Sequence, residues 1–245
     1  MVVVLSLLAE VVSPRFAGIL SGYPLGAAIS LFFMGFEISP EFASGSALYT
    51  SVGLVATQVF AYSYYRASLA AARRRRGLDI PFASLAGLAG FFIAASLLRM
   101  LAVSIVTAML LPTCFIILFI HLFKGIDNVK IEKRVDINLR LLLLRSIFAA
   151  AAIVIITSTA KLVGPRWAGL FSAFPITMLP LVVIIHFTYG PKHVHSILKN
   201  VPRGLGSLVI YSLAVFFFYP SYGIYVGTVM AYALATLYLI VVQFI

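Results

Sequence analysis

The sequence PRFAGILSGYP at Pro14–Pro24 recurs as PRWAGLFSAFP at Pro165–Pro175, an offset of 165 − 14 = 151 positions. The prolines, the arginine, the alanine, the first glycine and the serine coincide, and the other positions exchange residues of similar character. The same offset aligns Gly53 with Gly204. Matched proline, arginine and glycine at fixed spacing do not arise readily by chance in apolar sequence, so the pattern predicts an internal duplication.

The composition is that of a membrane protein. Of 245 residues, 62% are hydrophobic and 10% are charged, and the mean hydropathy is +1.10. A soluble domain has about a quarter charged residues, so we expect a polytopic membrane protein. The net charge of +11 resides in a few short loops, which indicates topogenic charge and not a nucleic-acid surface. Cys114 is the only cysteine, which excludes an intrachain disulfide and a cysteine-based metal site.

Nine apolar segments can be distinguished against the roughly 20 residues that a membrane-spanning helix needs. The first is too short to span alone. Arg99 marks the boundary between the fourth and the fifth. The segments are 2–12, 16–36, 42–65, 80–98, 101–123, 141–163, 167–189, 204–219 and 222–245.

The charged loops decide how these segments are threaded. Lysine and arginine in short loops stay in the cytoplasm, which places Arg73–Arg76 inside. Nine spans then put the basic loops 124–140 and 190–203 inside and the acidic connection Glu37–Glu41 outside. A single helix over 80–123 would put loop 124–140 outside, against this rule. The N-terminus is therefore expected outside and the C-terminus in the cytoplasm.

The expected fold is an all-α membrane protein of two inverted four-helix repeats joined by a linker helix. Residues 1–100 form the first repeat, 101–123 the linker transmembrane helix, 124–140 a cytoplasmic basic loop, and 141–245 the second, inverted repeat. Inverted repeats of this kind are common in secondary transporters.

Each copy of the repeated stretch resembles a helix start. Pro14 and Pro165 suit the first helical position, and the free N–H groups of a helix start favour an anion. Arg15 and Arg166 would add full positive charge there, as substrate-binding residues. The alternative is an ordinary interfacial turn in which the arginines extend to lipid headgroups.

The second proline of each copy, Pro24 or Pro175, is expected to kink its helix. Ser21 and Ser172 precede these prolines by three residues and are candidates to bond the loosened backbone or a substrate. Interrupted helices at corresponding places in two halves indicate a transporter binding site. A static packing kink is the alternative.

Glu10 and Lys161 occupy the same repeat position with opposite charges. An ionisable residue inside a span is costly and usually functional, so both are candidate substrate or ion sites, Glu10 for a proton or cation. Both could instead lie at helix ends in the interface. His186, the one histidine well inside a span, fits a packing role better than a ligand role. The sequence has no metal-ligand spacing, phosphate loop or nucleophile motif, so neither a metal, a cofactor nor an enzyme is predicted.

Small residues recur at every fourth position in the fourth and ninth segments, where they allow close helix packing. These segments could pack on each other, each within its own half, or form a homodimer. The residues are Ala86, Gly90 and Ala94 in one segment, and Gly223, Gly227, Ala231 and Ala235 in the other.

The second half also resembles a known family. Ala168-Gly169-Leu170 followed by Phe174-Pro175, an apolar helix and a basic loop, is similar to the GlpM family of small bacterial inner-membrane proteins. The first half matches more loosely, through Ala17-Gly18-Ile19 and Tyr23-Pro24. The chain thus resembles a tandem fusion of two such units. This resemblance implies an integral membrane protein and carries over no catalytic residue.

Together these patterns predict a secondary transporter of a small, anionic solute that works by alternating access. The expected partners are the lipid bilayer and a small-molecule or ion substrate. One alternative is a non-transporting membrane subunit or assembly protein that binds partners through its small-residue faces. The other is a lipid-modifying enzyme, which ranks last because the seven acidic residues are scattered.

Overall fold

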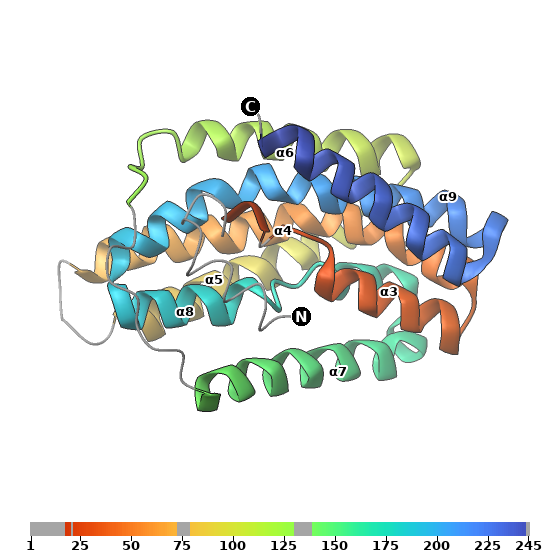
Figure 1. Cartoon of the computed structure of the whole chain (residues 1–245), viewed down its shortest axis with the longest axis horizontal. Coiled ribbons are helices and arrows are strands. Elements are labelled where there is room, and N and C mark those ends of the chain that lie inside the picture. The colour runs from red at the N-terminus through yellow and green to blue at the C-terminus, as the bar shows by residue number, and fades with distance from the viewer. Residues whose placement is uncertain (1–17, 21, 73–78, 130–138, 244–245) are drawn as a thin grey trace.

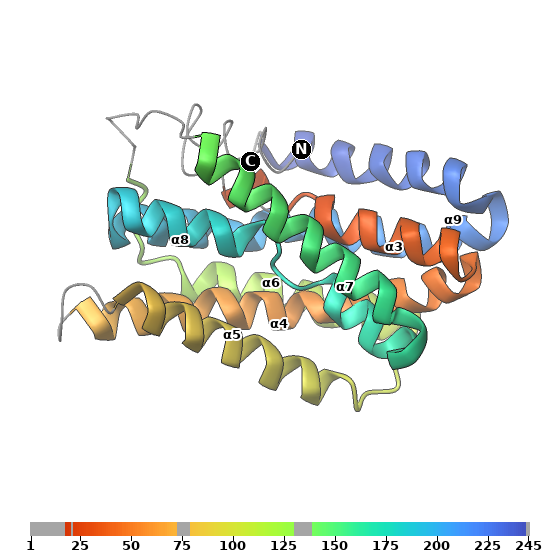
Figure 2. The same cartoon turned by 90° about the horizontal axis from the view of Figure 1, so that it is seen from below.

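The computed structural model describes residues 18–20, 22–72, 79–129 and 139–243. This described part contains helices and their connections and no strand, which confirms the predicted all-α class. The helices lie roughly along the long axis of the molecule (Figure 1 and Figure 2). They are α3 (Leu25–Glu37), α4 (Pro40–Ala72), α5 (Asp79–Leu98), α6 (Ile105–Leu122), α7 (Leu139–Ser172), α8 (Met178–Tyr189) and α9 (Pro191–Gln243).

Two glycines divide α7 and α9 into two arms each. Gly164 has φ 74° and ψ 171°, and Gly223 has φ 75° and ψ 171°. This backbone region is essentially restricted to glycine. The chain therefore reverses direction at both positions without a loop, and the second arm of α9 returns along the first (Figure 1).

The two ends of the molecule differ in their connections. One end, here called the basic end, holds the last turns of α4 and α6, the first turns of α5 and α7, and the α8–α9 connection (Figure 1 and Figure 2). Lys124 follows α6, and Lys192 lies in the first turn of α9. The opposite end holds the α3–α4 and α5–α6 connections and the two glycine turns. From the middle of the molecule, α3 runs to the opposite end and α8 runs to the basic end.

The outer helices present apolar side chains to the surroundings, whereas small polar side chains are buried inside. Leu85, Ile93 and Leu97 of α5 are 64–67% exposed, and Val229 of α9 is 70% exposed. Exposed apolar surface of this extent is typical of a membrane-facing or partner-facing protein. Among the described residues, four helices are long and apolar enough to span a membrane: 18–37, α5, α6 and 191–242.

Two of the helix boundaries differ from those that the sequence predicts, and others agree. The segments 80–98 and 101–123 are separate helices, since α5 ends at Leu98 and α6 begins at Ile105. The segment 167–189, predicted as one kinked helix, is instead divided between the short arm of α7 and α8. The predicted loop 190–203 is wrong, because it forms the start of α9.

The reason for the last difference is a buried apolar stripe. Val194, Ile197, Leu198 and Val201 are at most 1% exposed, and their spacing places them on one face of a helix. The basic residues of this stretch occupy other faces, so the charge that suggested a loop is compatible with a partly buried helix.

The small-residue faces pack within their own halves of the chain. Gly87 and Gly90 of α5 lie against Phe60 and Ser63 of α4. In the second arm of α9, Gly227 lies against the first arm, and Ala231 and Ala235 are fully buried. These contacts use the faces inside the chain, and a homodimer stays a prediction.

Candidate functional site

Both α3 and α8 begin directly after a break in the helix that precedes them. At the first break the amide of Gly22 donates to the Ile19 carbonyl (3.1 Å) and that of Tyr23 to the Leu20 carbonyl (3.0 Å). The amide of Leu25 then donates to the Tyr23 carbonyl (2.7 Å). This tight turn connects the helical residues 18–20 to α3.

The second break has the same hydrogen bonds at positions 151 residues later. The amide of Ala173 donates to the Leu170 carbonyl (3.2 Å) and that of Phe174 to the Phe171 carbonyl (2.9 Å). The amide of Ile176 donates to the Phe174 carbonyl (2.7 Å). The repeated sequence therefore produces the same backbone turn in both halves of the chain.

Each break is crossed closely by a helix from the other half of the chain. Gly204 of α9 lies against the backbone of Ile19, so near that a Cβ would overlap the Ile19 carbonyl oxygen. Gly53 of α4 lies against the second break, where a Cβ would come within 2.8 Å of the Ala173 Cβ. Since Gly53 and Gly204 are also 151 residues apart, the two crossings correspond.

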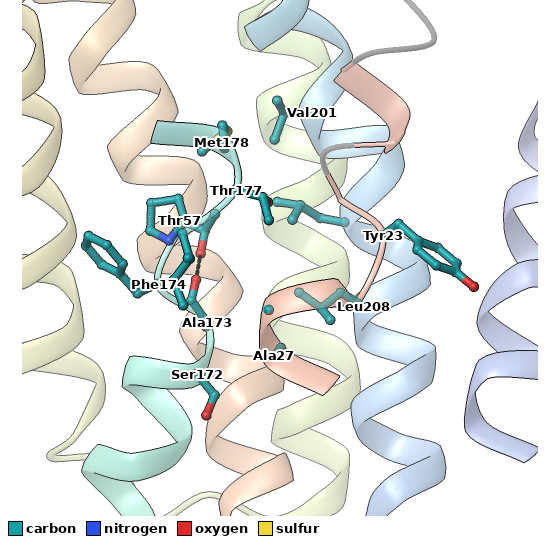
Figure 3. A pocket seen from close by; sticks show the side chains of 14 residues that line it. Tyr23, Ala27, Thr57, Ser172, Ala173, Phe174, Thr177, Met178, Val201 and Leu208 are labelled. Atoms are coloured by element: carbon teal, nitrogen blue, oxygen red, sulfur yellow. Dashed lines mark hydrogen bonds between the residues drawn. The ribbon is translucent and has the colours of Figure 1, made fainter. Parts of the chain in front are cut away.

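Hydroxyl groups on the crossing helices donate hydrogen bonds to backbone carbonyls at the breaks. Thr57 of α4 donates to the Ala173 carbonyl (2.6 Å; Figure 3), and Ser207 of α9 donates to the Gly22 carbonyl (3.0 Å). A helix break interrupts the regular carbonyl ladder, and a buried carbonyl without a donor costs free energy. These hydroxyls therefore stabilise the breaks inside the protein.

A small cavity lies between the two breaks (Figure 3). Its volume is about 30 Å³ measured with a water-sized sphere, which is room for about one or two waters. Tyr23 directs its hydroxyl away from the cavity, to Thr236 (2.9 Å). The lining residues are Tyr23, Gly26, Ala27, Thr57, Ser172, Ala173, Phe174, Pro175, Ile176, Thr177, Met178, Val201, Leu205 and Leu208.

The cavity is bordered by two helix N-termini. Gly26 and Ala27 belong to the first turn of α3, and Thr177 and Met178 start α8. Neither helix has a side-chain hydrogen bond at its N-cap. The first N–H groups of a helix carry partial positive charge, and no lining residue is charged. Two helix N-termini at a site without charged lining residues suit a small anion.

Some of the predicted site residues lie at this cavity. Ser172 and Pro175 line it, although the Ser172 hydroxyl donates to the Ala168 carbonyl of its own helix (2.9 Å). Pro24 is the N-cap residue of α3. Breaks in the helices occur where the two prolines predicted kinks, and their role as hinges stays a prediction.

Other predicted site residues lie away from the cavity or outside the described residues. Arg166 is exposed and its guanidinium lies 5.9 Å from the centre of the Tyr49 ring. Lys161 is exposed on the long arm of α7. Neither lines the cavity. The predicted sites Glu10, Arg15 and Ser21 lie outside the described residues.

Sequence reasoning did not find two features of the interior. One is Thr57, a polar residue whose importance depends on a helix more than one hundred positions away in the chain. The other joins Asp79, His186 and Tyr64: Nε2 of His186 lies 3.3 Å from Oδ2 of Asp79, and Nδ1 lies 2.9 Å from the Tyr64 hydroxyl. The lone histidine within a span was the available signal.

No family model, curated protein or solved structure matches this chain. The resemblance to the GlpM family therefore stays a prediction.

Proposed function

We propose that the chain is a multi-pass membrane transporter that carries a small anion by alternating access between two inverted repeats. The observation that carries the proposal is the convergence of the α3 and α8 N-termini on one cavity. Both helices start after breaks with the same hydrogen bonds. The cavity and the breaks thus supply the two elements of such a transporter, a central site and two interrupted helices around it.

The duplication in this proposal is supported by the correspondence of whole elements. Pro40 begins α4 and Pro191 begins α9, which is again an offset of 191 − 40 = 151. The breaks correspond, and so do the glycine crossings. Since α3 and α8 run from the middle to opposite ends (Figure 1), the proposed repeats are inverted relative to each other.

The proposed topology has nine spans, the first of which lies outside the described residues. The basic end faces the cytoplasm, because short loops rich in lysine and arginine are retained there. The N-terminus is then outside and the C-terminus inside. Five spans precede the second repeat, and because this number is odd, the second repeat has the opposite orientation in the membrane to the first.

The proposed site would bind its solute through backbone N–H groups and would exclude larger molecules. N–H groups already held by the fold replace part of the hydration shell of an anion without reorganisation, which favours binding. The volume of about 30 Å³ favours an anion of a few atoms. Thr57 and Ser172 already donate to carbonyls, so selectivity would rest mainly on the helix starts.

The charged residues take supporting roles in this proposal. Arg166, near the opposite end of the molecule, would raise the local anion concentration by electrostatic attraction, and Arg15 would do so on the other side. Glu10 and Lys161 would balance charge during the cycle. Replacement of Arg166 by lysine should preserve the uptake rate at low anion concentration, and replacement by alanine should reduce it.

The test is uptake by the purified, full-length protein in liposomes, measured for a panel of halides, nitrate and formate. Saturable uptake of at least one anion is expected. Gly26→Leu should abolish it, because Gly26 lines the cavity and a longer side chain there would fill the space. Gly26→Ala serves as the folding control, since its Cβ would meet Ile176 at an ordinary 3.6 Å.

Gly125→Leu is the matched control for side-chain size, because no atom lies within 4 Å of the position of its Cβ. Absence of uptake and of any anion-induced thermal shift across the panel would overturn the proposal. Stable co-purification with a membrane complex, together with tolerance of Arg15→Ala plus Arg166→Ala, would then favour the membrane-subunit alternative.

A further inference from the structure

A buried polar chain joins three helices on the basic side of the cavity. His186 of α8 stands between Asp79 of α5, at 3.3 Å, and Tyr64 of α4, at 2.9 Å. The side chain of His186 is 1% exposed and that of Asp79 is 21% exposed. The buried imidazole can therefore exchange a proton with the solvent at the basic end through the partly exposed carboxylate.

The position of this chain relates it to the cavity. Met178, which lines the cavity, and His186 lie on the same helix, separated by about 12 Å at 1.5 Å per residue. Asp79 is the first residue of α5, at the basic end. The polar chain thus lies between the cavity and the basic end, on the helix whose N-terminus borders the cavity.

The groups around His186 include few that carry charge. Asp79 faces it from α5 and Tyr64 from α4. On α9, Nε2 of His195 is bonded to the Ser68 hydroxyl (2.6 Å). Within the described part of the chain, His186 is the basic group that pairs with Asp79. In the described part of the chain, neither a lysine nor an arginine pairs with Asp79.

We infer that Asp79 and His186 form a proton-binding site that couples proton movement to the anion movement proposed above, on which this inference rests. In the unprotonated state, Nδ1 accepts from the Tyr64 hydroxyl, and Nε2 carries the hydrogen and faces the Asp79 carboxylate at 3.3 Å without a hydrogen bond. The incoming proton binds Nδ1, and the hydroxyl rotates to become the acceptor. The pair changes from net charge −1 to 0, and no other bond is made or broken.

This change of charge has a mechanical and an electrical consequence. Protonation turns the His186–Asp79 contact into a full ion pair, which holds α8 more firmly against α5. Because α8 also borders the cavity, the proton and the anion would favour the same position of one helix. One proton moving with one monovalent anion carries no net charge, so the membrane potential would not oppose uptake.

The coupling is tested in proteoliposomes that contain a pH-sensitive dye, with the anion that the uptake panel selects. An anion gradient directed into the liposomes should drive protons into them in the wild type. A pH gradient of one unit should raise anion accumulation by up to about tenfold. His186→Gln and Asp79→Asn should reduce this factor to about one. His121→Gln is the control, because His121 is exposed on α6 and bonded to the Ile117 carbonyl.

A second measurement tests the proton site without transport. Nitrogen NMR of the four histidines in the full-length protein should show that His186 gains a proton as the pH is lowered. Asp79→Asn should displace that titration, and Tyr64→Phe should alter the Nδ1 signal while leaving the fold intact. Neither substitution should change the His121 signal.

The outcomes separate the two proposals. A His186 that keeps one protonation state at every pH at which the protein stays folded overturns the proton site, whatever the uptake result. Anion uptake without proton movement overturns the coupling and leaves the proposed function standing. No uptake of any anion overturns the proposed function and the coupling with it.

Discussion

Gly204 of α9 lies directly against the main chain of Ile19, so that a Cβ at position 204 would overlap the Ile19 carbonyl oxygen. The neighbour is backbone and cannot rotate away as a side chain could. The corresponding residue Gly53 meets Ala173 at the other break. Helices that approach through glycine gain close van der Waals contact in a membrane, where no hydrophobic force drives them together.

Alanine at either crossing glycine is expected to separate the crossing helix from its break. Gly204→Ala and Gly53→Ala should each destabilise the fold by about 1–3 kcal/mol, the usual cost of overpacking. Thermal unfolding in detergent, followed by circular dichroism, measures this. Gly45→Ala, also in α4, is the control because its Cβ would meet its nearest neighbour at 3.9 Å. Equal melting temperatures for Gly53→Ala and Gly45→Ala would contradict the packing argument.

Thr57→Val should show how much the Thr57 hydroxyl stabilises the second break. Valine keeps the shape of threonine but leaves the buried Ala173 carbonyl without its donor at 2.6 Å, which costs about 1–3 kcal/mol. The melting temperature should fall, and Thr57→Ser should restore most of it. Thr113→Val is the control, because Thr113 is exposed and bonds its own helix. A fall as large in the control would show that the effect is not specific to the break.

Alanine at the glycine turns should destabilise the protein through backbone strain, not through overpacking. Gly164 and Gly223 have φ near 75° and no atom within 4 Å of a built Cβ, so alanine there would meet no clash. Gly164→Ala and Gly223→Ala should still cost about 1–3 kcal/mol each, because L-residues rarely adopt this conformation. Gly125→Ala, equally uncrowded but without a positive φ, should melt like the wild type. Unchanged stability in all three variants would refute the strain argument.

The proposed topology can be tested with single cysteines. Cys114 is the natural cysteine and is exposed on α6, so it is first replaced by alanine. Met100→Cys, 80% exposed between α5 and α6, should react with an impermeant maleimide added to intact cells. Gly125→Cys, on the α6–α7 connection, should react only after permeabilisation. Labelling of both cysteines from the same side would refute the proposed topology. The opposite pattern would show that the protein has the reverse orientation in the membrane.

The sequence by itself was sufficient for the helical class of the described residues and for the two breaks in the repeated stretch. High hydropathy and scarce charge determine an all-helical chain with helices able to span a membrane, since an apolar segment must satisfy its backbone internally. Pro24 and Pro175 lack an N–H, which favours a break at those positions, although α6 and α9 continue through Pro112 and Pro202. These are local properties, and a sequence displays them directly.

The basic stretch 190–203 shows where local reading fails. Its charges suggested a loop, yet Val194, Ile197 and Val201 form a buried stripe of α9. Charge composition and helical periodicity gave opposite indications there. The burial of the stripe against other helices, which the charges do not reveal, decided between them.

Only the tertiary structure decided which distant residues meet. Thr57 reaches the Ala173 carbonyl across 116 positions, and His186 reaches Tyr64 across 122. Long-range helix packing brings each pair together, and no short-range pattern encodes it. The sequence therefore determined that the repeated stretch would break two helices. The crossing of those helices by α4 and α9 decided that both breaks border one cavity.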